Sequence, residues 1–344
     1  MIVVHEIQQL GLGGTEKTML LFLRHLRALG VGELHAFSPR ARETGRASQV
    51  AEVAELYHYE DLEDLARRLR ALRPHVLHRH RSGYPDGLDE VELDPRTRIV
   101  ETNVYGDHGS RADLRLFVSR TVAREQGWPE PIDVLYNPCE PPVPGATVPR
   151  AYRRYPEVAD GDVEQVVVFG RVGRPSDYIY DPIALEAYAK VESPWTRYVA
   201  LAPPPNMVDH AAWLGLRTFL ALPPTTDERE LSRFYSLIDV LAHARRDGET
   251  CGMNIQEAMA HGLPVMTHLS GVHDAQPEVL GEGYPWIAPK GDREAYARFM
   301  REAIESPARR AELGERNRRR AQAEFDARRI AERLLVHYQR LSPA

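Results

Sequence analysis

Residues Asp247–Pro264, DGETCGMNIQEAMAHGLP, combine a glycine-rich loop, two glutamates and the start of a helix. Apolar residues recur there at i, i+3, i+4 and i+7 spacing, which predicts a short helix beginning near Met253. Gly262 suits the left-handed position just past a helix end, and Pro264 prevents continuation. Leu263–Thr267 is then expected to form a buried strand. The stretch therefore predicts a loop, a helix and a strand in direct succession.

The start of this helix is a candidate anion site. Unpaired N–H groups and the helix dipole give a helix N-terminus partial positive charge, so the backbone around Gly252, Met253 and Asn254 can hold a pyrophosphate. Helical side chains lean toward the N-terminus, so the carboxylate of Glu257 points back to the same place and can accept hydrogen bonds from a ribose diol. Glu249, in the loop, can reach a group beyond the phosphates. Taken alone, two such glutamates are more commonly solvated surface residues.

Length and composition limit the possible classes of protein. The 344 residues, 43% of them hydrophobic, are enough for two domains with separate cores. A net charge of −6 argues against a nucleic-acid binder. The two cysteines, Cys139 and Cys251, are too few for a disulfide framework and are expected to be reduced thiols. Neither a membrane-spanning apolar run nor a signal peptide is apparent, so we expect a cytoplasmic protein.

A second glycine-rich loop, QQLGLGGTEK, follows the strand predicted at Ile2–Ile7. It leads into an apolar-periodic helix expected at Thr15–Leu29, so strand, loop and helix form a unit whose backbone can approach a phosphate. A dinucleotide fingerprint would need glycine where Glu16 stands, so NAD binding is not predicted. Gly13 and Gly14 are the candidates for close approach to a ligand.

Short apolar strands alternate with helical segments along the whole chain. Strands are expected, for example, at Val76–His78, Arg98–Thr102, Asp133–Tyr136 and Gln165–Phe169. Repeated strand–helix alternation predicts parallel, doubly wound α/β sheets. Ligands of such sheets bind beyond the carboxyl ends of the strands.

Two of the strand ends carry candidate polar groups, and a third carries a histidine pair. Asn103 follows one predicted strand, and Gly170-Arg171 follows another. His78 and His80 do not by themselves predict a metal site. In the run His78-Arg79-His80 directly adjacent positions face opposite sides of a strand, and no Cys or second His pair is spaced to complete a tetrahedron.

Three motifs together resemble those of retaining GT-B glycosyltransferases of family GT4, the glycosyl transferases group 1. They are Glu249-x7-Glu257, the GGTE of the first loop, and Gly170-Arg171 after a strand of valines. The resemblance covers most of the chain and implies two Rossmann-like domains that face each other across a cleft. The proline-rich segment Glu140–Pro149 marks the boundary. The implied domains are residues 1–148 on the acceptor side, residues 149–325 for the nucleotide sugar, and a C-terminal helix at residues 326–344 that crosses back to the first domain.

The resemblance also implies a role for each motif residue. Glu257 would hold the ribose and Glu249 would act on the transferring sugar, while the glycines let the backbone approach the donor. The guanidinium of Arg171 would bind the diphosphate, because its planar fork matches two phosphate oxygens. Relatives usually carry a lysine a few residues later, but this chain has none there, and Arg174 is either its substitute or a plain loop charge. Relatives often carry a histidine at Asn103, so polar contact remains possible but acid–base chemistry does not.

The implied activity is transfer of a sugar from a UDP- or GDP-linked donor to an acceptor hydroxyl, with retention of anomeric configuration. No metal or other cofactor is expected, because Arg171, helix N–H groups and, if it substitutes for the lysine, Arg174 can meet the charge of the leaving diphosphate. The expected partners are the nucleotide-sugar donor and an unidentified acceptor in glycan, glycolipid or natural-product synthesis, with no nucleic acid. The arginine-rich face of Leu62–Arg73 leaves weak membrane-surface association open, although a solvated face is favoured. Two alternatives are a nucleotide-sugar-binding protein or partner subunit with impaired catalysis, and a sugar-nucleotide epimerase of the same fold.

Overall fold

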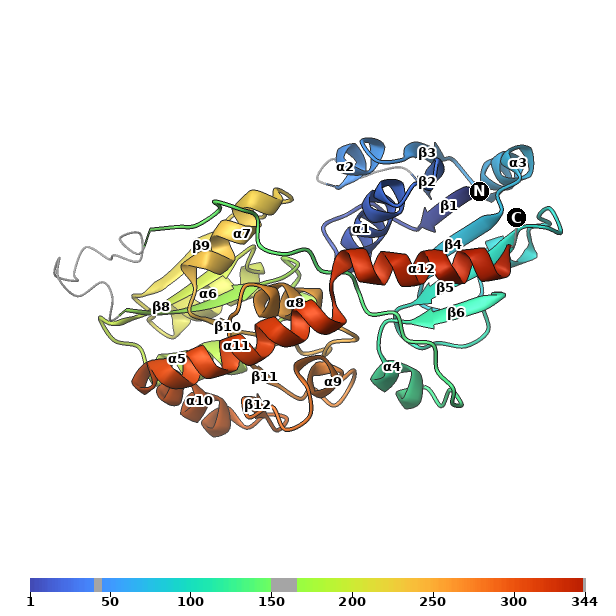
Figure 1. Ribbon diagram of the computed structural model, residues 1–344. Coiled ribbons are helices and arrows are strands. Elements are labelled where there is room, and N and C mark those ends of the chain that lie inside the picture. The colour runs from blue at the N-terminus through green and yellow to red at the C-terminus, as the bar shows by residue number, and fades with distance from the viewer. Residues whose placement is uncertain (40–44, 150–165, 343–344) are drawn as a thin grey trace. The chain divides into compact units, whose positions relative to one another are not determined.

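The computed structural model describes residues 1–39, 45–149 and 166–342. The chain divides into two compact units, which are described here separately: unit 1, Met1–Pro138 with Phe325–Ala344, and unit 2, Cys139–Glu324. Each unit contains a six-stranded sheet in which all neighbouring strands are parallel (Figure 1). The predicted α/β class with two Rossmann-like sheets is therefore confirmed.

The sheet of unit 1 has the order β3-β2-β1-β4-β5-β6, which is the strand order of dinucleotide-binding domains. Its strands are β1 (Ile2–Ile7), β2 (Glu33–Pro39), β3 (Glu55–Tyr59), β4 (Val76–Arg81), β5 (Arg98–Asn103) and β6 (Leu114–Phe117). Its helices are α1 (Gly14–Ala28), α2 (Ala47–Ala51), α3 (Leu62–Leu72), α4 (Arg120–Glu125) and the C-terminal α12 (Ala327–Leu341).

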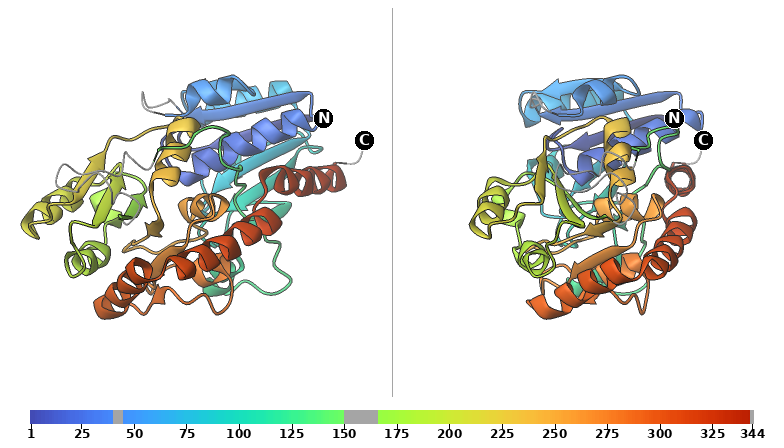
Figure 2. Two further views of the ribbon diagram at one scale, coloured as in Figure 1. Left: turned by 60° about the vertical axis from the view of Figure 1, so that its left-hand side comes forward. Right: turned by 90° about the vertical axis from the view of Figure 1, so that its left-hand side faces the viewer.

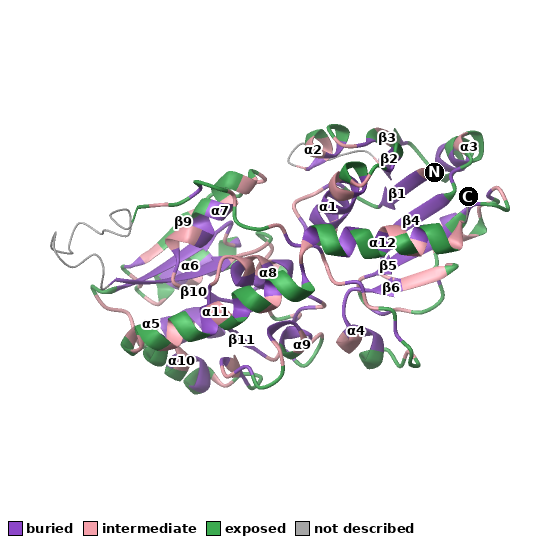
Figure 3. Cartoon of the chain, viewed as in Figure 1, coloured by how far each residue is buried: buried purple, intermediate pink, exposed green. Residues whose placement is uncertain are grey.

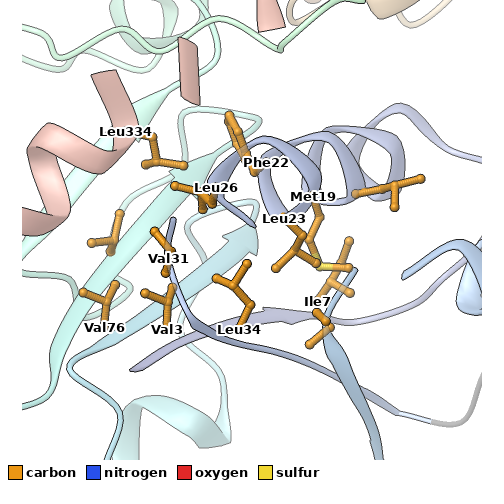
Figure 4. Packing of buried hydrophobic residues seen from close by; sticks show 14 of the residues in the cluster. Val3, Ile7, Met19, Phe22, Leu23, Leu26, Val31, Leu34, Val76 and Leu334 are labelled. Carbon is orange, nitrogen blue, oxygen red and sulfur yellow. The ribbon is translucent and has the colours of Figure 1, made fainter. Parts of the chain in front are cut away.

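The C-terminal helix completes the core of unit 1. Its apolar residues Ile330, Leu334 and Tyr338 are fully buried in one cluster with residues of α1 and of β1. Figure 4 shows Leu334 beside Phe22 and Leu26 of α1. Residues at i, i+4 and i+8 of a helix share a face, so α12 turns its apolar stripe toward the sheet. The expected return of the last helix to the first domain is confirmed.

The sheet of unit 2 has the order β12-β11-β10-β7-β8-β9, which repeats the arrangement of unit 1 strand by strand. Its strands are β7 (Val167–Val172), β8 (Thr196–Leu201), β9 (Phe219–Leu222), β10 (Val240–Ala242), β11 (Val265–His268) and β12 (Ile287–Ala288). Its helices are α5 (Ile183–Ala189), α6 (Pro205–Trp213), α7 (Glu228–Leu237), α8 (Met253–Ala260), α9 (Gln276–Leu280), α10 (Arg293–Glu305) and α11 (Pro307–Glu324). The strand predicted at Gln165–Phe169 corresponds to β7, and Gln165 itself lies outside the described residues.

Helix α8 begins and ends where the sequence predicts. It starts at Met253, and Gly262 takes a left-handed φ of 72° just past its end. Helix α11 packs against α8 at this point, as the views of Figure 2 allow the reader to follow. A β-carbon at Gly314 of α11 would lie 2.1 Å from the carbonyl oxygen of Gly262, so glycine is required for this approach. The remaining face of α11 is largely exposed (Figure 3).

Two segments differ from the expectation or extend it. Residues 133–136 form no strand, and only an isolated bridge joins Val134 to Phe117. The proline-rich segment packs on unit 2, because the backbone N–H groups of Val143 and Val148 donate to Ser232 and Ser236 of α7, at 3.1 and 3.0 Å.

Among the described residues, no helix combines the length and the apolar character needed to span a membrane.

Candidate functional site

The carboxyl edge of the unit 2 sheet brings together Arg171, His243 and a backbone carbonyl from the ends of three neighbouring strands. Arg171 lies near the end of β7, Ala202 directly follows β8, and His243 directly follows β10. These positions lie side by side, because β7 pairs with both β8 and β10. The loop from Arg245 to Gly252 continues from β10 and leads into α8. Open parallel sheets bind ligands at this edge.

Arg171 is a buried guanidinium with no carboxylate partner in the part of the chain that the structure describes. Backbone carbonyls hold it instead: Nη1 donates to Ala202 O at 3.0 Å, and Nη2 to Arg174 O at 3.5 Å. Burial, together with the nearby charge of Arg245, lowers the pKa of Arg171 to about 10, which leaves the group charged at pH 7. A buried charge without a counter-charge is costly, and an anionic ligand would relieve that cost.

The residues beside Arg171 have distinct structural roles. Gly170 is required by close packing, since a β-carbon there would lie 2.5 Å from Cδ1 of Ile238. Arg174 has an exposed side chain, and its backbone carbonyl is what contacts Arg171. Whether the Arg174 side chain replaces the missing lysine stays a prediction.

The start of α8 has a glycine as its N-cap residue, and its predicted role as an anion site stays a prediction. Gly252 precedes the helix in the left-handed region, with a φ of 77°, and as the N-cap residue it offers no side chain, although Oδ1 of Asn254 accepts from the N–H of Ile255 at 3.0 Å. A β-carbon at Gly252 would approach Cδ1 of Ile255 to 3.0 Å. Met253, the first helical residue, is nearly buried. The N–H groups of Ile255 and Gln256 are thus engaged within the turn, so a phosphate at this end would be met by the N–H groups of Met253 and Asn254.

Asn254, predicted to bind the donor, is engaged within the protein. Its amide nitrogen donates to Val172 O at 2.9 Å and approaches Nδ1 of His243 at 3.3 Å. The side chain thus joins the first turn of α8 to the ends of β7 and β10. Its contact with a ligand remains a prediction.

Glu257 is half-buried one turn into α8. The Tyr235 hydroxyl donates to its Oε2 at 2.7 Å and also lies 3.2 Å from the carbonyl oxygen of Asn254. Burial, followed by the charge of Glu257, raises the pKa of Tyr235 well above its usual range, so the phenol stays protonated and donates. Tyr235 therefore fixes the Glu257 carboxylate at the helix start.

Glu249 is a buried carboxylate in the loop before α8. Its Oε1 lies 3.3 Å from Nη1 of Arg245 and 3.3 Å from Nε2 of His243. Burial alone would raise the pKa of Glu249, but the Arg245 charge and the His243 contact outweigh burial, and the pKa is lowered. The group is therefore an anion at pH 7, with its charge met on one side.

Three residues of this site were not selected from the sequence. His243 and Arg245 follow β10 directly, so examining the residues after every strand would have found both. Tyr235 carries no such signal, because its link to Glu257 joins residues 22 positions apart on two helices.

The glycine loop of unit 1 closes tightly over its own helix. Gly13 precedes α1, and a β-carbon there would lie 2.3 Å from Oε2 of Glu16. Gly14 is the first residue of α1. Glu16 is buried, so its carboxylate folds back onto the loop and leaves no space for a side chain at position 13. The close packing explains the glycine at position 13, and the predicted contact of Gly13 and Gly14 with a donor stays a prediction.

Asn103, the other predicted catalytic position, holds its own loop. It is fully buried at the end of β5. Its Nδ2 donates to Asp107 O at 2.9 Å, and its Oδ1 accepts from the N–H of Gly106 at 2.7 Å. Both ends of the amide are thus engaged, which is the arrangement of a turn-stabilising asparagine.

Three buried histidines lie on one face of the unit 1 sheet, a grouping that the sequence did not predict. His78 and His80 are two residues apart on β4 and therefore share a face, and His5 pairs with His78 across β1. The rings of His78 and His80 are stacked, with centroids 4.5 Å apart and planes 20° apart. Nitrogen lone pairs lie in the ring planes, so two nearly parallel rings do not aim at one ion.

Hydrogen bonds join these histidines into a chain that includes α12. His80 Nε2 and His5 Nδ1 are 2.9 Å apart, and the Tyr338 hydroxyl lies 3.2 Å from His5 Nε2. The same hydroxyl contacts Nδ1 of His78, whose Nε2 reaches Thr102 at 2.7 Å. Burial lowers the pKa of all three histidines, that of His80 to about 3, so the chain is built from neutral rings.

A known family model matches part of unit 2. Residues 206–320 match the family model described as glycosyl transferases group 1. The spore coat protein SA of Bacillus subtilis is 31% identical over 143 residues, which cover 39% of this chain and 36% of the relative. The D-inositol 3-phosphate glycosyltransferase of Kineococcus radiotolerans is 29% identical over 219 residues, which cover 58% and 48%. The chain thus matches less than half the length of these curated relatives.

Comparison of structures covers the whole chain. The Anabaena protein Alr3699/HepE, solved in complex with UDP and glucose, has a TM-score of 0.78 at 16% identity, over 98% of this chain and 99% of that one. A glycosyltransferase from Rickettsia africae has a TM-score of 0.72 at 12% identity, over 99% of each chain. Structural similarity at such low sequence identity establishes the fold and nothing about function. The chain therefore resembles the glycosyl transferases group 1 over residues 206–320, and as a whole it has the GT-B fold of glycosyltransferases.

Proposed function

We propose that this protein is a retaining glycosyltransferase that moves a sugar from a nucleotide-diphosphate sugar to an acceptor hydroxyl without a metal ion. The bond from the anomeric carbon to the diphosphate oxygen breaks, and the electron pair leaves with the nucleotide diphosphate. The acceptor oxygen bonds to the same carbon and loses its proton. The products are a glycoside and a nucleotide diphosphate.

The observation that carries this proposal is the buried guanidinium of Arg171, which has no carboxylate partner among the described residues and lies next to Val172, the residue bonded by Asn254 at the start of α8. A leaving diphosphate gains negative charge as the bond breaks, and preorganised donors at that place stabilise the transition state. Arg171 supplies a fixed positive charge, and the backbone after Gly252 supplies N–H groups. In this scheme Glu257, oriented by Tyr235, receives the ribose, and Glu249 faces the transferring sugar.

The identity of the donor is a finer part of the proposal. UDP and glucose occupy Alr3699/HepE, whose fold this chain shares, so we take UDP-linked hexoses as the first donors to test and GDP-linked ones as the second. Retention rests on the resemblance of the Glu249-x7-Glu257 motif to those of retaining enzymes. The anomeric configuration of the first-formed product, read by proton NMR, tests it directly.

A second candidate function has one observation in its favour. Asn103 stands where many relatives carry a histidine, and its amide is already engaged in its own loop. A nucleotide-sugar-binding protein without catalysis would fit that arrangement. The purified chain should hydrolyse or transfer from at least one donor if it is an enzyme. Tight donor binding without any turnover, over a panel of donors and acceptors, would favour the binding protein.

The donor-binding scheme makes a separate prediction for Glu257. Glu257→Ala should weaken binding of the nucleotide diphosphate by about 1.5–3 kcal/mol, the size of hydrogen bonds to a charged group. Isothermal titration calorimetry with UDP, GDP, ADP and dTDP measures this loss. Tyr235→Phe serves as a partial variant, because it removes the hydroxyl that orients Glu257 and keeps the carboxylate. An unchanged affinity in Glu257→Ala would remove its role in binding the ribose.

A further inference from the structure

The two oxygens of the Glu249 carboxylate have different surroundings. Oε1 lies 3.3 Å from Nη1 of Arg245 and 3.3 Å from Nε2 of His243. Oε2 has no side-chain donor among the described residues. One oxygen is therefore anchored by the protein, and the other is left as an acceptor. A carboxylate held in this way can receive a hydroxyl from a ligand without turning.

The hydrogen bonds around His243 assign the position of its proton. The amide nitrogen of Asn254 lies 3.3 Å from His243 Nδ1, and an amide nitrogen can only donate. Nδ1 is therefore the acceptor, so in the neutral ring the proton is on Nε2. That is the nitrogen that faces Oε1 of Glu249. Asn254 thus sets the tautomer. The Nε2–H group lies close to the Glu249 carboxylate but is not aligned with it as a hydrogen bond, so the contact is electrostatic.

Asn254 is itself fixed on both of its N–H groups. Besides His243, its amide nitrogen donates to Val172 O at 2.9 Å, and Val172 directly follows Arg171 in β7. Asn254 lies in the first turn of α8, so the helix fixes the position of its backbone. A continuous path of contacts therefore runs from the end of β7, through α8, to the end of β10 and the Glu249 loop.

Arg245 is oriented independently of Glu249. Its Nε and Nη2 donate to the two oxygens of Asp247, at 2.9 and 2.6 Å. This bidentate pairing fixes the plane of the guanidinium and leaves Nη1 directed at Glu249. The next residue, Arg246, is exposed, and its side chain forms no such bond to any residue that the structure describes. Two adjacent arginines therefore differ in whether they reach the carboxylate.

We propose that His243, Arg245 and Asn254 are positioning residues that hold Glu249 by Oε1 and reserve Oε2 for a hydroxyl of the bound substrate. The role of that hydroxyl rests on the function proposed above, whereas the tautomer and the anchoring concern this chain alone. Asn254 then acts on Glu249 through His243, in place of the donor contact expected from the sequence. None of the three residues needs to touch the reacting atoms.

The first test measures the tautomer and needs no enzymatic activity. Long-range nitrogen–proton NMR of the full chain at pH 7 distinguishes Nε2–H from Nδ1–H imidazoles, and the His243→Gln spectrum assigns the signal. We expect a single Nε2–H tautomer in the natural chain. Asn254→Asp replaces the donor by an acceptor of the same shape, so His243 should change to Nδ1–H or become an imidazolium. A natural chain with Nδ1–H, or a tautomer indifferent to Asn254→Asp, would overturn the proposal.

The second test compares kinetics with binding. His243→Leu and Arg245→Gln should lower kcat about 10- to 100-fold, the usual range for a misplaced group, while affinity for the nucleotide diphosphate stays within twofold. His243→Gln keeps an N–H at the Nε2 position and should recover part of the loss. Arg246→Gln is the matched control and should leave kcat unchanged.

The two tests separate failure of this inference from failure of the proposed function. A natural chain that turns over no nucleotide sugar, yet shows the Nε2–H tautomer and its reversal, would refute the function and keep the positioning of Glu249. An active chain whose kcat is insensitive to both His243→Leu and Arg245→Gln would refute the positioning and keep the function. Equal losses in Arg245→Gln and Arg246→Gln would also refute it.

Discussion

At the scale of single residues, the candidate site is marked by two buried charged groups, Arg171 and Glu249. Arg171 is buried with no counter-charge among the described residues, whereas Glu249 is buried with its charge met on one oxygen only. Each therefore has capacity left for a ligand. The sequence indicated both residues, because strand ends and the acidic motif are local patterns. It could not indicate that the side-chain amides of Asn103 and Asn254 bond to other groups of the chain. The partners of these amides depend on how loops and strand ends meet.

Loss of the Arg171 charge tests the scheme of catalysis without metal. Arg171→Ala should reduce turnover about 100-fold or more, the usual effect of removing one preorganised donor. Arg171→Lys should recover only part, because an ammonium cannot bridge two phosphate oxygens. Steady-state kinetics with the best donor, with and without EDTA, measures both variants. Arg174→Ala is the companion variant: a mild effect identifies a loop charge, and an effect equal to that of Arg171→Ala identifies a substitute for the lysine. Strict dependence on Mg²⁺ together with a harmless Arg171→Ala would refute the scheme.

At the scale of elements, the sequence predicted central strands and amphipathic helices better than edges. Strands such as β1 and β7 are buried apolar runs, and α8 carries both its helical period and its terminating glycine. The edge strand β3, ELYHY, was missed because half-exposed polar residues interrupt its apolar pattern. The shared face of His5, His78 and His80 was missed because it depends on the pairing of β1 with β4, and pairing is not local information.

The glycine loop before α8 supports a prediction with a matched control. Gly248 has a φ of 68°, and a β-carbon there would lie 2.1 Å from His273 O, which accepts the N–H of Glu249. Gly30 has a φ of 87° with nothing near its β-carbon position. Gly30→Ala should therefore cost only about 1–2 kcal/mol of stability for the left-handed backbone. Gly248→Ala adds a clash to that strain and should displace Glu249.

Thermal unfolding and turnover together measure this difference. We expect a larger loss of Tm in Gly248→Ala than in Gly30→Ala, and loss of turnover in Gly248→Ala alone. Equal stability and equal turnover in the two variants would mean that the backbone at residue 248 relaxes without moving the carboxylate.

At the scale of the whole molecule, the chain builds the same strand order twice and then returns to the first unit. The repeated strand–helix alternation made the two sheets predictable. The return of α12 was expected from the family resemblance, and its physical cause is the apolar stripe of Ile330, Leu334 and Tyr338. The polar contact of Tyr338 with two histidines was not predictable, because those residues are 260 and 333 positions away in the chain. Unit 1 therefore depends on both ends of the chain.

The three buried histidines make unit 1 less stable in acid. The sign of this pH dependence follows from their pKa values. Their pKa is lowered in the folded protein, that of His80 to about 3, against an ordinary value of 6.5. The unfolded chain therefore binds more protons below pH 6.5. Stability from keeping these rings neutral is fully present above pH 6.5 and is lost as the pH falls toward the folded pKa. Each histidine contributes a loss approaching about 1.4 kcal/mol per pH unit in that range.

We expect the three histidines together to cost unit 1 about 4 kcal/mol between pH 7.5 and pH 5.5, a large part of the 5–15 kcal/mol typical of a domain. Urea unfolding at several pH values measures this, with Trp128 reporting on unit 1 in a chain whose other three tryptophans are replaced by Phe. His78→Gln removes one buried imidazole, so the loss of stability between pH 7.5 and pH 5.5 should shrink by about 1.4 kcal/mol, after any constant loss of stability is subtracted. Carboxylates contribute little above pH 5.5, because their ordinary pKa values lie near 4. An identical slope in His78→Gln and the natural chain would show that His78 is already protonated, or already exposed, in the folded protein.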